Sequence, residues 1–239
     1  MTLMKRGLLA LLCAGSLLGA AGVQAQEATI RKNLAERIPQ IGTIDEVSKT
    51  PMTGLFEVRI GTDIFYTDAE ANYLIQGNLI DARQRRNLTE ERTEKLLAID
   101  FSSLPTKDAF TIVRGNGKRK MAVFQDPNCG YCKRFEREVQ KVDNVTIHMF
   151  LYPILGQDST DKSRNIWCAK DKGKAWADWM IRDQAAPSAT CDTAALARNV
   201  EFGKKHKITG TPTLVFVDGS RVPGAIGIAQ VEKFLAEAK

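Results

Sequence analysis

The chain has 239 residues, of which 44% are hydrophobic and 26% are charged, and its formal net charge is +6 at pH 7. This hydrophobic fraction supports ordinary globular cores and excludes a mainly disordered chain. The excess of positive charge is small and both signs are mixed along the sequence, so the composition does not indicate a nucleic-acid-binding protein.

The N-terminus has the pattern of a secretory signal peptide. Lys5 and Arg6 precede an apolar run over residues 7–22, and Val23-Gln24-Ala25 forms a small-x-small cleavage site. We therefore expect residues 1–25 to be a signal peptide that is cleaved after Ala25. A membrane anchor is the alternative, but the run is short for a membrane span and rich in Gly and Ala.

Removal of residues 1–25 leaves 214 of the 239 residues, which is more than one small domain needs, so we expect two domains. Four of the five cysteines remain, because Cys13 lies within the signal peptide. An even number of cysteines in an exported protein permits two disulfides, and three different pairings would satisfy that number.

The first part of the mature chain predicts a small α+β unit. Apolar residues recur at helical spacing over residues 27–38, and Pro39 ends that helix. Strand-like patterns follow over residues 56–60, 64–67 and 73–80. A unit of roughly sixty residues is marginally stable alone, so we expect residues 26–86 to dimerise through a sheet edge. A monomeric accessory domain is the alternative.

A mostly polar helix is predicted next. Asn87-Leu88-Thr89-Glu90 resembles a helix-capping box, and helical spacing continues to residue 99. A polar helix between two apolar-patterned regions is usually a solvated spacer. We therefore expect a linker helix over 87–101, which connects the N-terminal domain to a catalytic domain over 102–239.

The catalytic domain begins with a predicted hairpin. Strand-like runs over 110–113 and 121–124 flank Asn116-Gly117, a favoured hairpin-turn dipeptide. A further strand is predicted over 145–152. It contains His148, for which a position in the core or on a strand face is favoured over a role as catalytic base, because thiol exchange needs no separate histidine.

A helical insertion is predicted over about 159–206. It contains the three tryptophans, which are most simply explained as its core: Trp167, Trp176 and Trp179. Thr211-Pro212 then precedes a strand over 214–217, and a proline at the start of a central strand is costly unless it faces a ligand or ends the pairing. An amphipathic helix ends the chain.

The motif that carries chemistry is Cys129-Gly130-Tyr131-Cys132, which lies between the predicted strand over 121–124 and a helical run that starts at Lys133. In that context Cys-x-x-Cys indicates a redox dithiol. Cys129 is expected beside the free N–H groups of the first helical turn, where the helix dipole favours negative charge. Cys132, one turn further, is expected to be shielded by the chain.

A lowered pKa at Cys129 mainly makes that thiol a better leaving group. A free thiol with a pKa of about 8.5 is only about 3% ionised at pH 7, whereas a pKa of about 6 makes it mostly thiolate. Because nucleophilicity falls with basicity, the rate of attack rises only a little, but mixed disulfides form and break readily. This property suits a catalyst of disulfide exchange.

Other interpretations of the cysteines fit less well. A zinc ribbon needs two close cysteine pairs, whereas Cys168 and Cys191 lie 23 positions apart. Haem attachment needs a histidine where Lys133 stands. A purely structural bridge between Cys129 and Cys132 is disfavoured because two intervening residues make a strained ring. A Cys168–Cys191 bridge could be structural or a second exchange site.

The combination of motifs resembles a known family. The strand–Cys-Gly-Tyr-Cys–helix unit and the later Thr211-Pro212 resemble the thioredoxin fold. Three further segments resemble, more specifically, the periplasmic disulfide isomerases of Gram-negative bacteria (DsbC type): Ile166–Lys172, Gly210–Pro212 and Val222–Gly224. The order of export signal, small domain, linker helix and thioredoxin domain also matches, over essentially the whole mature chain.

The resemblance implies a fold class and a set of site residues. The fold would be α+β, with a cystatin-like dimerisation domain, a linker helix and a thioredoxin-like domain with a helical insertion. Cys129 would attack and Cys132 would resolve. The residues that would line the substrate groove are Gly130, Tyr131, Thr211 and Pro212. Cys168 and Cys191 would form the non-catalytic disulfide.

The resemblance also implies partners and a compartment. The chain would be a periplasmic homodimer that isomerises or reduces wrong disulfides in misfolded exported proteins, with accessory chaperone activity. A membrane thiol-relay reductase of the DsbD type would keep Cys129 and Cys132 reduced. Thiol exchange needs no metal, nucleotide or flavin.

Three other functions remain open on the sequence alone. An oxidase of the same fold would donate a Cys129–Cys132 disulfide. A holdase would suppress aggregation even without the Cys129 thiol. A DsbG-type reductase and chaperone would act on fewer clients, although its Cys-x-x-Cys usually differs from the dipeptide found here.

Overall fold

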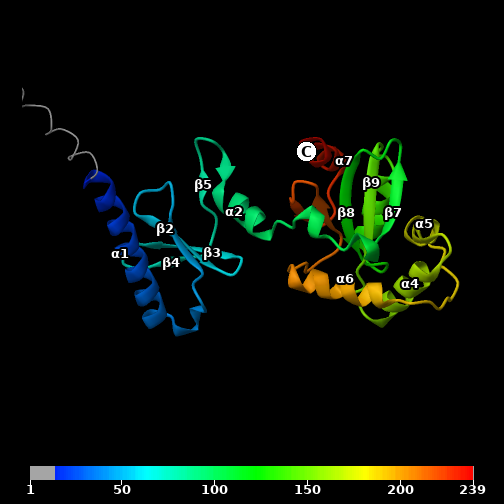
Figure 1. The fold of residues 1–239 in the computed structure, drawn as a ribbon, viewed down its shortest axis with the longest axis horizontal. Helices are drawn as coiled ribbons and strands as arrows, with labels where there is room; N and C mark the ends of the chain where they lie inside the picture. Colours follow the sequence, from blue (N-terminus) through cyan, green and yellow to red (C-terminus); the bar gives the residue numbers. More distant parts are fainter. Residues whose placement is uncertain (1–13, 239) are drawn as a thin grey trace, which may run out of the picture. The chain divides into compact units, whose positions relative to one another are not determined.

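The computed structural model describes residues 14–238, with side chains described from residue 24 onward (Figure 1). Part of the predicted signal peptide, residues 1–13, lies outside the described residues. The chain divides into two compact units, Met1–Leu96 and Leu97–Lys239. Within the described residues, no helix combines the length and the apolar character that a membrane crossing requires.

The N-terminal unit packs a helix against an antiparallel sheet with the order β1-β2-β3-β4, and a short β5–β6 hairpin follows. Its elements are α1 (Ala14–Arg37), η1 (Pro39–Ile41), β1 (Glu46–Lys49), β2 (Leu55–Ile60), β3 (Asp63–Asp68), β4 (Leu74–Ile75), β5 (Ile80–Asp81) and β6 (Arg86–Asn87). Ile30 and Leu34 on one face of α1 pack against Val47, Phe56 and Val58 of the sheet. The helical spacing of apolar residues and the strand alternation therefore meet in one small core.

Two N-terminal predictions differ from the structure. The helix predicted over 27–38 already includes Ala14, the first residue that the structure describes, and it ends at Arg37, before Pro39. The strand predicted over 73–80 is broken into β4 and β5, because its Ile75 and Ile80 side chains are 51% and 59% exposed and have no core to pack on. The sheet contains a further strand, β1, which the alternation of apolar and polar residues in the sequence did not reveal.

The predicted linker helix is α2 (Leu88–Leu97), and it is fixed to the N-terminal sheet. The Thr89 hydroxyl accepts the backbone N–H of Leu79 at 2.7 Å and bonds the Tyr66 hydroxyl at 2.5 Å. Arg92 forms ion pairs with Glu57 at 2.9 Å and with Glu46 at 2.7 Å. The prediction that the charges of this helix are only solvated is therefore wrong for Arg92.

The C-terminal unit is a five-stranded sheet, in the order β11-β10-β8-β9-β7, with helices on both faces. Its elements are η2 (Phe101–Ser103), η3 (Thr106–Asp108), β7 (Phe110–Arg114), β8 (Arg119–Gln125), α3 (Gly130–Val139), β9 (Val145–Leu151), α4 (Gln157–Cys168), α5 (Lys172–Arg182), α6 (Ala194–Lys205), β10 (Thr213–Phe216), β11 (Arg221–Pro223) and α7 (Ile228–Glu237). β8 and β9 are parallel, and the other pairs are antiparallel.

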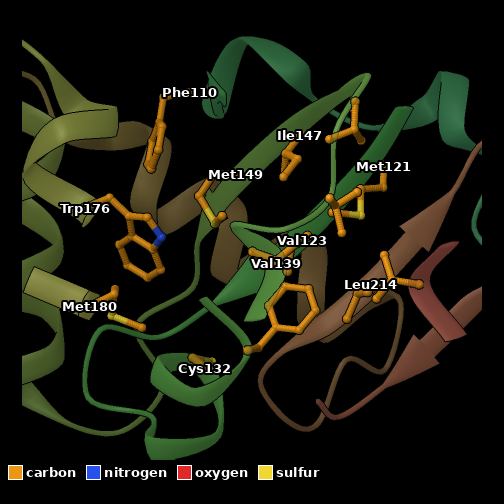
Figure 2. Packing of buried hydrophobic residues seen from close by; sticks show 14 of the residues in the cluster. Phe110, Met121, Val123, Cys132, Val139, Ile147, Met149, Trp176, Met180 and Leu214 are labelled. Carbon is orange, nitrogen blue, oxygen red and sulfur yellow. The ribbon is translucent and has the colours of Figure 1, made fainter. Parts of the chain in front are cut away.

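The central strand β8 contributes to both cores of this unit. Met121 and Val123 lie in the cluster that includes residues of α3 and α5 (Figure 2). Ala122 and Phe124 lie in the cluster on the other face of the sheet. Because side chains alternate along a strand, one buried strand divides the two cores. The same strand leads to Cys129 through a short turn, so a central, buried strand of the sheet helps to set the position of the dithiol.

The predicted hairpin of 110–113 with 121–124 is wrong. β7 turns near Gly117, but β9 lies between β7 and β8 and pairs with both. β8 is buried along its last five residues and therefore needs a neighbour on each side, whereas β7 alternates buried and exposed residues as an edge strand does. The predicted strand over 145–152 supplies one neighbour and displaces β7 to the edge.

Two glycines in the helices of the C-terminal unit differ in the space around them, and their substitution by alanine is predicted to have opposite effects on stability. A Cβ on Gly203 would lie 2.4 Å from the buried ring of Tyr152, whereas a Cβ on Gly173 in α5 would have 3.6 Å to its nearest neighbour. We expect G203A to destabilise the C-terminal unit by about 1–3 kcal/mol. We expect G173A to stabilise it by at most about 1 kcal/mol, as Gly→Ala does in helices.

Urea unfolding followed by tryptophan fluorescence measures both effects, because all three tryptophans of the chain lie in the C-terminal unit. A G203A protein as stable as the unsubstituted protein would contradict the packing described here.

Candidate active site

Cys129 ends the segment after β8 and caps the N-terminus of α3. Its Sγ accepts the backbone N–H of Cys132 at 3.3 Å, in the place where a capping oxygen usually lies. The Cys129 thiol also donates to the carbonyl oxygen of Thr211, 3.1 Å away. The first contact suits the thiolate and the second suits the thiol, so the site accommodates both protonation states.

The two thiols differ sharply in environment. A hydrogen bond from the Cys132 thiol lowers the pKa of Cys129 to about 5, helped by the Thr211 side chain and backbone N–H groups and opposed by burial. Burial raises the pKa of Cys132, and the hydrogen bond and charge of Cys129 raise it further. Cys129 is 6% exposed and Cys132 is wholly buried in the core (Figure 2). One sulfur is thus ionised and almost wholly buried, and the other is protonated and fully enclosed.

The loop of Thr211 and Pro212 lies against Cys129. The Thr211–Pro212 peptide bond is cis, and the Pro212 side chain is buried. The carbonyl of Pro212 accepts the N–H of Gly224 at 2.7 Å, which joins this loop to the end of β11. Thr213, the first residue of β10, pairs with Phe124 of β8. The sheet therefore holds the loop and the dithiol in fixed register.

The predicted groove residues lie around the dithiol to different degrees. Thr211 and Pro212 are brought to Cys129, whereas Gly130 and Tyr131 lie at the exposed start of α3. Tyr131 is 63% exposed, and the guanidinium of Arg134 lies 5.2 Å from the centre of its ring. Tyr131 is thus an exposed aromatic side chain next to the dithiol.

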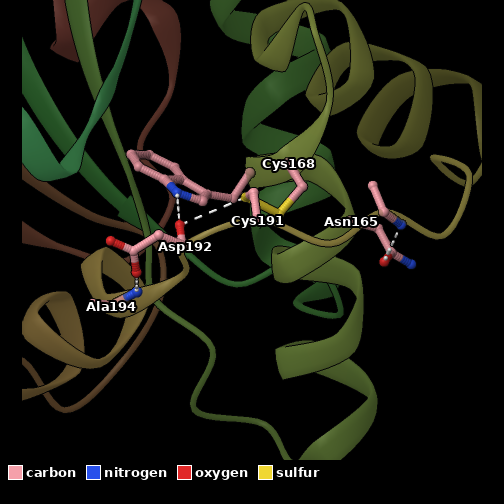
Figure 3. The surroundings of a disulfide bond; sticks show 7 residues. Asn165, Cys168, Cys191, Asp192 and Ala194 are labelled. Atoms are coloured by element: carbon pink, nitrogen blue, oxygen red, sulfur yellow. Dashed lines mark hydrogen bonds between the residues drawn. A yellow bond between two sulfur atoms is a disulfide. The ribbon is translucent and has the colours of Figure 1, made fainter.

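The other two cysteines form a disulfide between the last residue of α4 and the segment before α6 (Figure 3). Trp167, the neighbour of Cys168, donates its indole N–H to the carbonyl of Asp192 at 3.1 Å. The Asp192 carboxylate in turn accepts the N–H of Ala194 at 2.9 Å, at the start of α6. The disulfide thus lies within the insertion and joins α4 to the segment that leads into α6.

Sequence reasoning missed Asp126, which holds the turn before Cys129. Asp126 is wholly buried, and its carboxylate accepts the N–H groups of Asn128, Ile154 and Leu155 at 2.8–2.9 Å. It also accepts the hydroxyl of Ser159 at 2.7 Å. A buried carboxylate needs such partners. An aspartate three residues before the motif was visible in the sequence, but nothing there showed that it is buried.

Trp179 and Glu136 were also missed as neighbours of the site. Trp176 belongs to the main core as predicted, but Trp179 is only partly buried and donates its indole N–H to the carbonyl of Pro127 at 2.7 Å. Glu136 lies one turn after Cys132 and is wholly buried; burial raises its pKa, and Gln125 donates to it at 2.6 Å. The spacing of apolar residues along a helix does not indicate the bond of Trp179 to Pro127 or that of Glu136 to Gln125.

His148 lies on β9, outside the Cys-x-x-Cys motif, and its side chain lies beside the ring of Phe101. Its imidazole meets the ring of Phe101 edge-on, with 6.0 Å between ring centres, and burial lowers its pKa. Within the described residues, no group of three or more His, Cys, Asp or Glu side chains is arranged to hold a metal ion.

Comparisons with known proteins cover both units. A family model described as a thioredoxin-like domain matches residues 106–239, and one described as the N-terminal domain of disulfide bond isomerase proteins matches residues 21–90. The probable thiol:disulfide interchange protein DsbC of Bordetella parapertussis is 45% identical over 207 residues, which cover 87% of this chain and 73% of that protein. DsbC of Escherichia coli K12 is 29% identical over 238 residues, which cover 98% and 97%.

A solved structure agrees with these matches. A disulfide interchange protein from Neisseria gonorrhoeae is 38% identical, with a TM-score of 0.54, and the match covers 56% of this chain and 98% of that one.

A parallel β8–β9 pair, a thiolate at the start of α3 and a cis-proline loop against it define a thioredoxin-fold thiol–disulfide oxidoreductase. The family match over residues 21–90 and the 45% identity to the DsbC protein of Bordetella parapertussis assign the chain to one family within that class. The chain belongs to the DsbC family of thiol:disulfide interchange proteins, and the fold class expected from the sequence is confirmed.

The hydrogen bond between the two thiols generates a prediction about pH. In the reduced protein the alkylation rate of Cys129 should rise with pH through a midpoint near 5 and then level off, because only the thiolate reacts. Cys132→Ala removes the largest contribution to that low pKa, so the midpoint should move up by about one unit or more. Cys132→Ser keeps a hydroxyl donor and should retain most of the shift.

Iodoacetamide kinetics between pH 4 and pH 9, roughly the range that brackets the lowered and ordinary thiol pKa values, measure both midpoints. Equal midpoints for the alanine and serine variants would show that the side chain of residue 132 does not stabilise the thiolate.

Proposed function

We propose that this chain isomerises and, secondarily, reduces non-native disulfides in exported proteins, with Cys129 as the attacking thiol and Cys132 as the resolving thiol. The observation that carries the proposal is the contrast between the two sulfurs: Cys129 is ionised at the start of α3, and Cys132 is protonated beneath it. Cys168 and Cys191 have no part in the exchange.

Isomerisation needs only the first of these thiols. The Cys129 thiolate attacks one sulfur of a client disulfide, so that a Cys129–client disulfide forms and the other client cysteine leaves as a thiolate. That thiolate, or a different client cysteine, then attacks the client sulfur of the mixed disulfide and expels Cys129 as a thiolate. The client keeps its number of disulfides, and the enzyme ends in the reduced state.

Reduction is the slower escape route. If the mixed disulfide persists, Cys132 loses its proton to the client thiolate or to water and attacks the Cys129 sulfur. A Cys129–Cys132 disulfide forms, and the client is released as a thiol with two electrons gained. Because burial raises the pKa of Cys132, this step is delayed and the client has time to rearrange. An external dithiol reductase must then restore the pair, and we propose a membrane thiol relay of the DsbD type.

The client surface is proposed to extend around the dithiol. Tyr131 and Leu155 are 63% and 54% exposed, and Leu155 is held beside the turn by the Asp126 carboxylate. Thr211 and Pro212 complete the groove at Cys129. Apolar side chains at the rim of a reactive thiol support binding of unfolded rather than folded clients, and thus an accessory chaperone activity.

We also propose that the protein is a periplasmic homodimer whose domains are 26–86, 87–101 and 102–239, after cleavage near Ala25. The separation of the two units near Leu96 and the two family matches support this division. Three exposed large apolar side chains on or next to the two-residue strands β4 and β5 support dimerisation of the first domain: Tyr73, Ile75 and Ile80. Two active sites on one dimer would hold a client by avidity.

Cysteine substitutions test the assignment of roles. With a scrambled multi-disulfide protein as substrate, Cys129→Ser should reduce the regain of native activity to the uncatalysed rate. Cys132→Ser should retain early isomerisation but accumulate covalent enzyme–client adducts, because escape is blocked. The assay follows client activity and adducts on non-reducing gels. Isomerisation by the Cys129→Ser variant would refute the proposed roles, whereas retained suppression of aggregation by it would assign the chaperone activity to binding alone.

Removal of the N-terminal domain tests the proposed dimer. A protein starting near Leu88 should sediment as a monomer and lose most isomerase activity, but keep reduction of a small disulfide substrate, which needs one site only. The intact protein should sediment as a dimer, and charged substitutions at Tyr73 and Ile75 should dissociate it. Undiminished isomerisation by the truncated monomer would contradict a role for paired sites.

A further inference from the structure

The turn that precedes the nucleophile is held by the helical insertion. The turn consists of Asp126, Pro127 and Asn128, and each of these residues has a hydrogen-bond partner in the segment from Ile154 to Trp179. Asp126 accepts from Ser159 of α4 at 2.7 Å, and the Asn128 side chain donates to Asp158 of α4 at 2.7 Å. Pro127 has its carbonyl bonded by Trp179 of α5 at 2.7 Å. The insertion thus contacts every residue of this turn.

The peptide group between Pro127 and Asn128 is fixed at both ends. Its carbonyl oxygen accepts the indole N–H of Trp179, and its N–H donates to the Asp126 carboxylate at 2.8 Å. A peptide group is planar, so two opposed hydrogen bonds prevent its rotation. The next residue is Cys129, whose sulfur must stay 3.3 Å from the N–H of Cys132 for the thiolate to be stabilised. Rotation of this peptide would move that sulfur.

The environment of Trp179 strengthens its indole N–H as a donor. The ammonium groups of Lys133 and Lys162 lie 4.1 Å and 4.6 Å from the centre of the Trp179 ring. Cations over a π face attract ring electrons and polarise the N–H bond outward. Both ammonium groups are held in place by carboxylates, Lys133 by Asp183 and Lys162 by Asp158.

The other two tryptophans of the insertion do not share these contacts. Trp176 is enclosed in the main core, where it lies beside the Glu136 carboxylate. Trp167 makes the same kind of bond as Trp179, from its indole N–H to a carbonyl at 3.1 Å, but its acceptor is Asp192 beside the disulfide. Trp167 is therefore a matched control for a bond that has no contact with the dithiol.

We propose that Trp179 is a positioning residue for Cys129, which fixes the Pro127–Asn128 peptide from the insertion and so keeps the nucleophile in contact with the first turn of α3. This inference rests on the proposed role of Cys129 as the attacking thiol. Through Trp179 the insertion tunes the reactivity of the dithiol. Lys133 and Lys162 support the ring and its donor.

Trp179→Phe tests the proposal, because it keeps an aromatic ring and removes the N–H. The midpoint of the pH profile for Cys129 alkylation should move upward, and below that midpoint the rate should fall about threefold or more, the size expected for one hydrogen bond. Trp167→Phe should leave the profile unchanged, even if both variants lose similar stability in urea. Identical shifts in the two variants, or none in Trp179→Phe, would overturn the proposal.

Lys162 provides a second test that leaves the indole in place. Lys162→Met removes a cation from the ring and also the hydrogen bond from Lys162 Nζ to Asn128 Oδ1 at 3.0 Å, so it tests the combined support of the ring and the turn. The methionine variant should shift the profile in the same direction as Trp179→Phe, and Lys162→Arg should return it toward the original. A methionine variant that reacts like the unsubstituted protein would overturn the proposed support of the ring and the turn by Lys162. Failure of Cys129→Ser to abolish isomerisation would reject the proposed function instead, because alkylation involves no client.

Discussion

The N-terminus of α3 is capped by a sulfur atom. A side-chain oxygen usually accepts the free N–H groups at a helix start, and here Sγ of Cys129 accepts the N–H of Cys132. The charge that makes Cys129 a good leaving group is therefore the same charge that completes the helix. When Cys129 enters a mixed disulfide the charge is lost and the cap weakens. Expulsion of Cys129 from the mixed disulfide restores its charge and the helix cap. The geometry at the start of α3 therefore favours release of the client.

The burial of Cys132 complements this capping. Both thiols lie within one helical turn, yet Cys132 faces the core (Figure 2). Cys129 faces the loop of Thr211 instead. Burial disfavours the Cys132 thiolate, so Cys132 stays a hydrogen-bond donor to Cys129 and lowers the pKa of its partner. A more exposed Cys132 would ionise more easily, weaken this donation and resolve mixed disulfides sooner. The two pKa shifts therefore have a common structural origin.

The sequence was sufficient for features that depend on local spacing, and insufficient for contacts between distant segments. The Cys-x-x-Cys motif at a helix start predicted which thiol caps α3 and which is buried. The hairpin prediction failed because the Asn116-Gly117 turn is local, whereas the insertion of β9 between β7 and β8 is decided by burial on both sides of β8. Trp179 gave no signal, because a tryptophan in an amphipathic helix has the same pattern whether its N–H meets a neighbour or not.

The active-site turn is held by hydrogen bonds from the segment that follows β9 and from the helical insertion. Asp126 is wholly buried, and its carboxylate oxygens accept from Ile154, Leu155 and Ser159 as well as from Asn128. Without the first three donors a buried charge would keep one N–H partner from its own turn, which is a costly state. The turn and the start of the insertion must therefore form together. The sheet sets the position of the dithiol, and the helical insertion adds contacts that fix the turn before Cys129.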